Sequence, residues 1–207
     1  MRADYHEVLD TARRDLTQLG ALTKDALHYA LQAFKKRDTA MAGRIIADDQ
    51  MDLLRRKIET TCVELLWRQQ PVASELREVT AMHEIAIDLG IAMGQVNEIA
   101  KQAIKAATAD ACPETTNVHK VAAMTESMLG DAMQAFDKRD AELAESVYAR
   151  AQQVEDYYTP VIEEIQDQMQ ADPNAVSCGV SLLFEMTALQ RIAERAENIA
   201  WHTEEML

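Results

Sequence analysis

Two aspartates four residues apart, Asp48 and Asp52, have a spacing that could do chemistry in this 207-residue chain. They continue an apolar series, Met41 and Ile45, in steps of four, three and four residues, which places all four side chains on one face of a helix. A carboxylate on an apolar face is costly unless another group neutralises it. The pattern therefore predicts a counter-charge or a bound metal ion at Asp48 and Asp52.

A second set of polar residues lies in the other half of the chain. Gln190, Glu194 and Asn198 recur every four residues and form one polar line on a predicted helix. Glu155, on the preceding predicted helix, could face this line. Two interpretations stay open: a single metal bound by Glu155, Glu194 and a side-chain carbonyl, or a satisfied polar contact between two helices.

The motifs of common enzyme classes are absent from the sequence. None of the five histidines has a glutamate three residues before it, so the E-x-x-H motif of ferritin-like di-iron enzymes is missing. Gly90 and Gly94 lie inside a helical pattern with no preceding strand, which argues against a glycine-rich phosphate loop. No G-x-S-x-G motif occurs either. We therefore predict a protein that is not an enzyme and does not bind nucleotide.

The charge balance argues against two classes of partner. The chain has 35 acidic and 21 basic side chains, for a formal net charge of -14. Such a charge repels nucleic acid and anionic membrane surfaces. The N-terminus is charged, and no apolar run approaches the roughly 18 residues that a membrane span requires. We expect a soluble, cytoplasmic protein that does not insert into the membrane.

The cysteines point to the same compartment. Cys62, Cys112 and Cys178 are odd in number, far apart and include no C-x-x-C pair. The pattern predicts neither a disulfide framework nor a thiolate zinc site, and it is typical of a reducing cytoplasm.

Long helices must position these side chains, because the composition disfavours sheets. Glycine and proline number only 6 and 4, and aromatic residues make up 5% of the chain. Asp38 and Asp140 are candidate N-terminal caps, and Pro71 suits the first turn of a helix. Pro160 predicts a kink or a local break. We expect helices up to about residue 37 and over about residues 38–67, 71–107, 117–138, 140–171 and 175–207.

The two halves of the chain repeat each other. LQAFKKRD, residues 31–38, recurs as MQAFDKRD, residues 133–140, 102 positions later. NEIA, residues 97–100, is echoed by ENIA 100 positions later. The duplication predicts an all-α fold of two tandem antiparallel three-helix bundles, with six long helices. The first repeat would cover residues 1–109 and the second residues 116–207, with a linker around residues 110–117.

The segment QPVASELR, residues 70–77, resembles the signature between helices two and three of the PhoU family, bacterial regulators of phosphate uptake. LQRIAERAENIA, residues 189–200, resembles a segment of that family's second repeat. The resemblance covers essentially the whole chain. It implies a negative regulator that contacts the ATPase subunit of a phosphate transporter and a membrane sensor histidine kinase. The alternative is a helical scaffold or metal-binding protein of this fold without the transporter partnership.

The resemblance also implies metal sites, because family members place D-x-x-x-D and E-x-x-x-D on the second and third helices, and some bind iron or zinc there. Asp48 and Asp52 keep the first pair, but Gly90 and Gly94 replace both acids of the second pair. In the second repeat one acid of each pair survives, and the four positions hold Ala151, Glu155, Gln190 and Glu194. We therefore predict degenerate sites with at most weak or partial occupancy by iron or zinc.

The turn that carries the family signature is the candidate partner contact. It contains Gln70, Pro71, Ser74, Glu75 and Arg77, which we expect to be exposed. The alternative is a purely structural role, in which Pro71 and Arg77 fix the turn and pair across helices. We also expect a homodimer.

Overall fold

The computed structural model of the chain describes residues 2–113 and 116–207, and these residues are helical with no strand. The helices are α1 (Arg2–Lys36), α2 (Thr39–Ala47), α3 (Gln50–Gln69), α4 (Ser74–Ala106), α5 (Thr116–Lys138), α6 (Ala141–Ala171) and α7 (Val176–Met206), with a 3-10 turn at Pro173–Ala175. The predicted all-α fold is confirmed. The predicted linker 110–117 includes residues 114 and 115, which lie outside the described residues.

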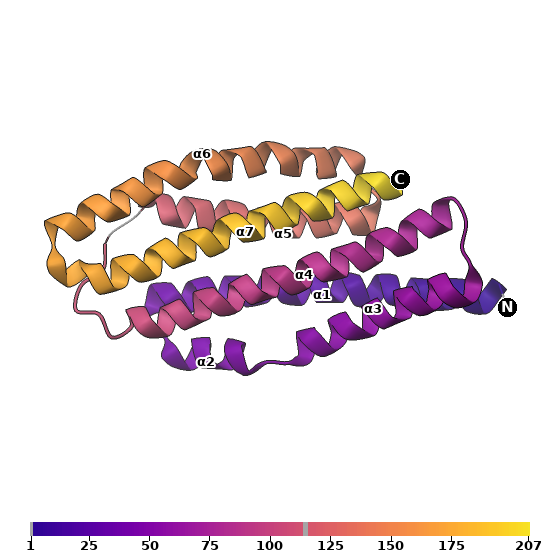
Figure 1. Ribbon diagram of the computed structural model, residues 1–207, viewed down its shortest axis with the longest axis horizontal. Helices are drawn as coiled ribbons and strands as arrows, with labels where there is room; N and C mark the ends of the chain where they lie inside the picture. Colours follow the sequence, from indigo (N-terminus) through magenta and orange to yellow (C-terminus); the bar gives the residue numbers. More distant parts are fainter. Residues whose placement is uncertain (1, 114–115) are drawn as a thin grey trace.

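The helices form an elongated bundle in which α4 and α7 run antiparallel through the middle (Figure 1). Helices α1, α2 and α3 pack on α4, and α5 and α6 pack on α7. The two repeats join where α4 meets α7 and where α1 meets α5. One end of the bundle has the N-terminus and the turn between α3 and α4, and the other has α2 and the start of α7 (Figure 1). We call these the turn end and the α2 end.

The duplicated KRD sequence makes the same local structure in both repeats. Arg37 and Arg139 adopt left-handed backbone conformations, with φ of 55° and 54°. The aspartates that follow, Asp38 and Asp140, each accept a hydrogen bond from the backbone N–H three residues on, at 2.9 and 3.0 Å. The predicted caps at Asp38 and Asp140 are therefore confirmed.

The predicted second helix, residues 38–67, is interrupted, so this expectation was wrong. Helix α2 ends at Ala47, and α3 begins only at Gln50. Asp48 is extended (φ −80°, ψ 116°), and its Oδ1 accepts a hydrogen bond from the backbone N–H of Gln50 at 2.9 Å. Aspartate side chains compete with helical hydrogen bonding in this way, and hydrophobic spacing does not reveal it.

Two proline expectations also need correction. Helix α4 begins at Ser74 instead of Pro71, because the backbone of Gln70 and Ala73 is left-handed, with φ of 47° and 50°. Pro160 lies inside α6, which continues through it, so the predicted alternative of a local break is wrong and the kink stays a prediction.

The core follows the repeat closely. Every buried position of α4 between residues 78 and 100 is also buried in α7, one hundred residues later. Helices α1 and α5 show nearly the same match at an offset of 102 between residues 21 and 38. Corresponding positions can therefore be compared directly: Glu78 corresponds to Cys178, and Arg37 corresponds to Arg139.

A disulfide joins Cys112 to Cys178, so the expectation of no disulfide was wrong. The two residues are 66 positions apart, but their Cα atoms are separated by only 5.0 Å. The antiparallel arrangement of α4 and α7 brings the connection after α4 back to the start of α7, and sequence spacing cannot show this. Cys62 is free and buried, and burial raises the pKa of its thiol to about 12. The cysteine pattern therefore no longer supports a reducing compartment.

None of the helices within the described residues is both long and apolar enough to cross a membrane.

Candidate functional site

The acidic positions of repeat one come together as the sequence predicts. Asp48 and Asp52 line one pocket of about 250 Å³ with Gly90 and Gly94 of α4. The positions that carry paired acids in the metal-binding pattern therefore do face each other across α3 and α4. The side chains there, however, are not those of that pattern.

Arginines neutralise Asp52. Its Oδ1 accepts a hydrogen bond from Nη2 of Arg55, and its Oδ2 accepts one from Nε of Arg56, both at 2.7 Å. Arg55 also pairs with Glu59 on the same helix. The hydrogen bond from Arg55 is the main cause that lowers the pKa of Asp52, followed by the one from Arg56. The counter-charge that the sequence predicted at Asp52 is thus present in the protein itself.

Gly90 makes room for this arrangement. A Cβ at position 90 would lie 2.5 Å from Cδ of Arg55, so the arginine side chain lies against the glycine. Asp48 is engaged separately, as the acceptor for the backbone of Gln50. With two acids lost to glycine and an arginine beside Asp52, the side chains of repeat one do not fit an iron or zinc site.

The corresponding pocket of repeat two, about 190 Å³, is lined by Ala151, Glu155, Gln190 and Glu194. Nε2 of Gln190 donates a hydrogen bond to Oε2 of Glu155 at 2.6 Å. Glu194 is exposed, and Nη2 of Arg195 lies 3.6 Å from its Oε2. This geometry matches the polar-contact interpretation, and metal binding by Glu155 and Glu194 stays a prediction. No group of three or more His, Cys, Asp or Glu residues is placed to hold a metal ion within residues 2–113 and 116–207.

The signature turn is only partly exposed as predicted. Gln70, Ser74 and Arg77 are exposed, Glu75 is half-buried, and Pro71 is buried. The side chain of Arg77 makes no ion pair with any described residue, so the predicted alternative of pairing across helices is not seen. Pro71 therefore fits a structural role, while Arg77 is free for a partner.

Large apolar side chains surround this turn. The exposed fractions are 75% for Trp67, 71% for Val72, 53% for Val63 and 43% for Leu76. We call these four residues the apolar turn surface. Clustered exposed apolar residues mark interaction sites more often than isolated ones do. Sequence reasoning missed them, although Val63 and Trp67 are one helical turn apart at the end of α3.

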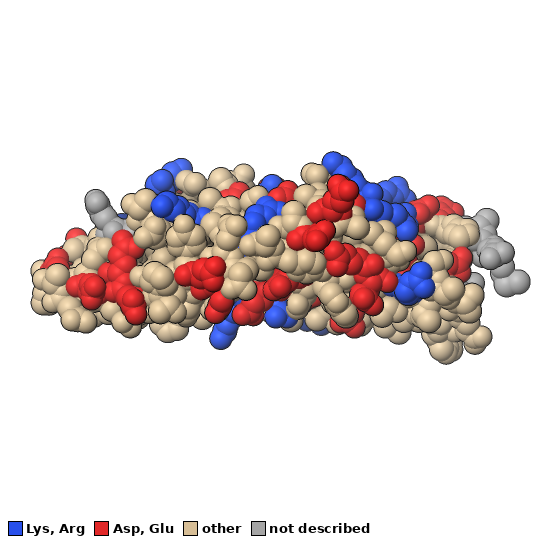
Figure 2. Space-filling model, turned by 90° about the horizontal axis from the view of Figure 1, so that it is seen from above, with Lys and Arg blue, Asp and Glu red and all other residues tan. Residues whose placement is uncertain are grey.

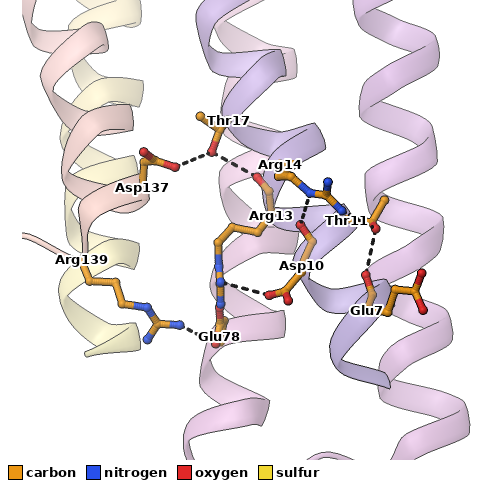
Figure 3. A network of polar contacts seen from close by, with 9 residues as sticks. All are labelled: Glu7, Asp10, Thr11, Arg13, Arg14, Thr17, Glu78, Asp137 and Arg139. Atoms are coloured by element: carbon orange, nitrogen blue, oxygen red, sulfur yellow. Dashed lines mark hydrogen bonds and ion pairs between the residues drawn. The ribbon is translucent and has the colours of Figure 1, made fainter. Parts of the chain in front are cut away.

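An ion-pair network surrounds Glu78, which lies one helical turn after the start of α4 (Figure 3). Glu78, buried in α4, pairs with Arg13 of α1 through one carboxylate oxygen. Its other oxygen is 2.8 Å from Nη2 of Arg139, which precedes α6. Thr17 of α1 also donates a hydrogen bond to Asp137 of α5 at 3.2 Å. The start of α4 is therefore tied to both repeats, which fixes the signature turn relative to the rest of the bundle.

A second network crosses the centre of the α4–α7 contact. Oδ1 of the buried Asp88 lies 3.2 Å from Nη1 of Arg195 and 3.4 Å from Nδ2 of Asn198. Nε2 of His202 lies 3.5 Å from its Oδ2. The sequence singles out neither Asp88 nor Glu78 by spacing, because their partners are distant along the chain.

Fold and turn together define a class of duplicated helical proteins. The family model of the PhoU domain matches residues 16–105 and 118–202. The chain belongs to the PhoU family.

Named relatives and solved structures agree with this assignment. The chain is 29% identical over 198 residues to the phosphate-specific transport system accessory protein PhoU homolog of Pseudomonas aeruginosa, covering 95% of this chain and 82% of that relative. It is 23% identical over 196 residues to the accessory protein PhoU of Escherichia coli (strain K12), covering 94% of this chain and 81% of that relative. The crystal structure of PhoU from Pseudomonas aeruginosa matches with a TM-score of 0.93 at 28% identity, over 98% of both chains. That of the phosphate transport system regulatory protein PhoU from Streptococcus pneumoniae matches with a TM-score of 0.89 at 26% identity, over 98% of this chain and 96% of that one.

Proposed function

We propose that the chain is a non-enzymatic, cytoplasmic negative regulator of phosphate uptake and of phosphate-starvation signalling. The match covers 82% and 81% of the length of two relatives that are named as accessory proteins of the phosphate-specific transport system. This supports a role in regulating phosphate transport. The finer part of the proposal is that the chain contacts the transporter's ATPase subunit and a sensor histidine kinase. Phosphate sufficiency would favour this complex and hold the kinase in its repressive state.

The apolar turn surface supports contact with a protein partner more than any other observation. Trp67 and Val72 are largely exposed, although burying either side chain would be favourable. Tryptophan is enriched among the residues that dominate binding energy at protein interfaces. The Glu78 network holds the turn in one place, so little order would have to be gained on binding.

The charge of the chain indicates the character of the partner. Asp and Glu side chains form clusters along the face seen in Figure 2, with Lys and Arg among them, and the net charge is -14. A partner with a basic patch next to an apolar pocket would match this surface, and its association would slow as salt is added.

An affinity pull-down from phosphate-replete cells, with retained proteins identified by mass spectrometry, tests the proposal. We expect the phosphate-transporter ATPase or the sensor kinase to be retained by the wild-type chain and lost with Trp67→Ala. At high external phosphate, cells that lack the protein should also take up phosphate faster than wild-type cells do. Recovery of neither partner by a folded, abundant bait, together with normal uptake, would favour the scaffold alternative.

Two further expectations belong to this proposal. Weak iron or zinc binding at Glu155 and Glu194 is tested by elemental analysis of protein purified without chelators. Two or more tightly held metals per chain would contradict the degenerate-site interpretation. The expected homodimer is tested by light scattering.

A further inference from the structure

A pocket of about 600 Å³ lies between the repeats at the α2 end. We call it the inter-repeat pocket. Residues of α1, α5 and α7 line it, together with Ala106 at the end of α4 and with Cys112 and Pro113. Its apolar lining includes Leu31, Phe34, Ala122 and Leu182. The volume lies within the range of about 300–1,000 Å³ that is typical of small-molecule sites, and it exceeds what a single inorganic ion fills.

Basic side chains line the same pocket. Lys35 makes no ion pair with any described residue, and Nη1 of Arg37 donates only to the backbone carbonyl of Ala109, at 2.8 Å. Nδ1 of His28 lies 3.1 Å from Oε1 of Glu126. The remaining basic group is His119. The pocket therefore presents positive charge in an otherwise strongly acidic protein.

Comparison with the turn end shows that the inter-repeat pocket lacks a carboxylate partner for its arginine. There, Arg139 pairs with the carboxylate of Glu78. At the α2 end the corresponding arginine is Arg37, but the residue that corresponds to Glu78 is Cys178, which is bonded to Cys112. Both Arg37 and Cys178 line the inter-repeat pocket. The carboxylate that neutralises the arginine at one end is thus replaced at the other end by a disulfide and an open pocket.

We propose that the inter-repeat pocket binds a small organic anion whose carboxylate or phosphate group pairs with Arg37 and Lys35, in the role that Glu78 has for Arg139. The apolar part of such a ligand would contact the lining around Leu182. The inference goes beyond the regulatory proposal and does not depend on it.

The buried acid of the pocket is compatible with an anion. Glu185 is 4% exposed, and its Oε2 has no hydrogen-bond partner. Burial raises the pKa of its carboxyl group to about 8, so the group is neutral at pH 7 and can donate a hydrogen bond to an oxyanion. The other titratable groups on the pocket are His28, Lys35, Arg37, His119 and Glu126. Above pH 8 the ionised acid would repel the ligand, so binding should weaken.

Isothermal titration of the full chain at pH 7 tests the proposal with three probes: inorganic phosphate, 3-phosphoglycerate and succinate. We expect saturable binding of 3-phosphoglycerate, of succinate or of both. Because 3-phosphoglycerate carries both groups, its binding without that of succinate would assign the phosphate group, and binding of succinate would assign the carboxylate. Arg37→Gln should weaken it by about tenfold or more, because a charge-assisted contact is lost. The matched variant Arg139→Gln, at the turn end, should bind as wild type does. Saturable binding of neither organic probe at millimolar concentration, or equal affinity in Arg37→Gln, would overturn the proposal.

A second pair of variants separates the ligand site from the disulfide. Cys178→Ser and Cys178→Glu both remove the disulfide, but only Cys178→Glu supplies a carboxylate at the position that corresponds to Glu78. We expect Cys178→Ser to bind the probe and Cys178→Glu to lose at least tenfold in affinity. Circular dichroism would establish that both variants are folded. Equal affinity of the two folded variants would contradict the assignment of this pocket to an anion.

Discussion

The turn end and the α2 end of the bundle are built from corresponding residues, but they handle charge differently. At the turn end, Glu78 forms ion pairs with both Arg13 and Arg139, so the charges are neutralised within the protein. At the α2 end, Arg37 has no carboxylate partner among the described residues, and Cys178 is covalently tied to the connection after α4. Burial is therefore preserved between the repeats while the polar partners are not. The apolar pattern determines the fold, and single polar substitutions give each end its own properties.

The surfaces of the two ends differ in the same way. The turn between α3 and α4 carries Val72 where the turn between α6 and α7 carries Asp172. The carboxylate of Asp172 is already engaged within its own turn, because its Oδ1 accepts hydrogen bonds from the backbone N and from Nδ2 of Asn174 at 2.9 and 3.1 Å. Val176, which corresponds to Leu76, is 40% exposed at the α2 end, but Val72, 71% exposed, has a polar counterpart there. We therefore assign the protein contact to the turn end.

Reduction of the disulfide should have the largest effect on the α2 end. A bond between residues 66 positions apart restricts the unfolded chain, and its loss should lower the free energy of unfolding by about 3–4 kcal/mol. Urea denaturation with and without a thiol reductant measures this difference. Cys112→Ser should unfold at the same urea concentration in both conditions. An unchanged midpoint for the oxidised wild type on reduction would show that the disulfide does not stabilise this end.

At the turn end, Glu78→Gln should be the most damaging substitution of a polar residue. It leaves Arg13 and Arg139 facing each other without a carboxylate, and we expect a loss of about 2–3 kcal/mol, since both arginines keep some contact with water. The control is Glu64→Gln, because Glu64 has only an exposed contact with Arg68 at 3.8 Å, worth less than about 1 kcal/mol. Similar losses for the two variants in chemical denaturation would rule out a special role for the network.

The buried acid at the α2 end predicts a pH dependence. The folded-state pKa of Glu185, about 8, lies above its ordinary value of 4.5. Its protonated form therefore contributes stability that is fully present below pH 4.5 and is lost as the pH rises through 8. Glu185→Gln cannot ionise, so it should gain on the order of 2 kcal/mol relative to wild type between pH 6 and pH 7.5. Parallel stability curves for the two proteins over this range would contradict the assignment.

Between the two ends, a pair of glycines should show the smallest effect. Gly94→Ala adds a methyl group where no atom lies within 4 Å, so it should stabilise α4 by about 0.5–1 kcal/mol. Gly90→Ala should gain less or be destabilising, because its methyl group must displace Arg55 from beside Asp52. Thermal unfolding compares the two variants. A Gly90→Ala protein as stable as Gly94→Ala would show that Gly90 is not needed to seat the arginine.

Much of the fold was readable from the sequence because it depends on local patterns. Helical spacing, the aspartate caps and the duplicated KRD segment predicted the number of long helices and their order. The facing positions of Asp52 and Gly90 followed from the resemblance. The break after Ala47 was missed, because one aspartate hydrogen bond there outweighs a continuous apolar stripe.

The rest of the candidate site depends on contacts between residues far apart in the chain. The two arginine partners of Glu78 are 65 and 61 positions away from it along the chain. Cys112 and Cys178, which form the disulfide, are 66 positions apart. Nothing in local spacing marks such pairs. The place of Arg55 beside Asp52 was likewise invisible, since it requires knowing that the arginine side chain lies against Gly90.

The central claim is that the turn end contacts the phosphate transporter. Titration of the purified ATPase subunit with the wild-type chain, Val72→Asp and Asn174→Ser tests it most directly. Val72→Asp places at the turn end the residue found at the corresponding position 172 of the α2 end. Asn174→Ser is the control at the α2 end and places there the residue found at the corresponding position 74 of the turn end. We expect Val72→Asp to weaken binding by about tenfold or more, by burying a charge against an apolar surface, and Asn174→Ser to bind as wild type does. Unchanged affinity in Val72→Asp, or a loss only in Asn174→Ser, would contradict the claim.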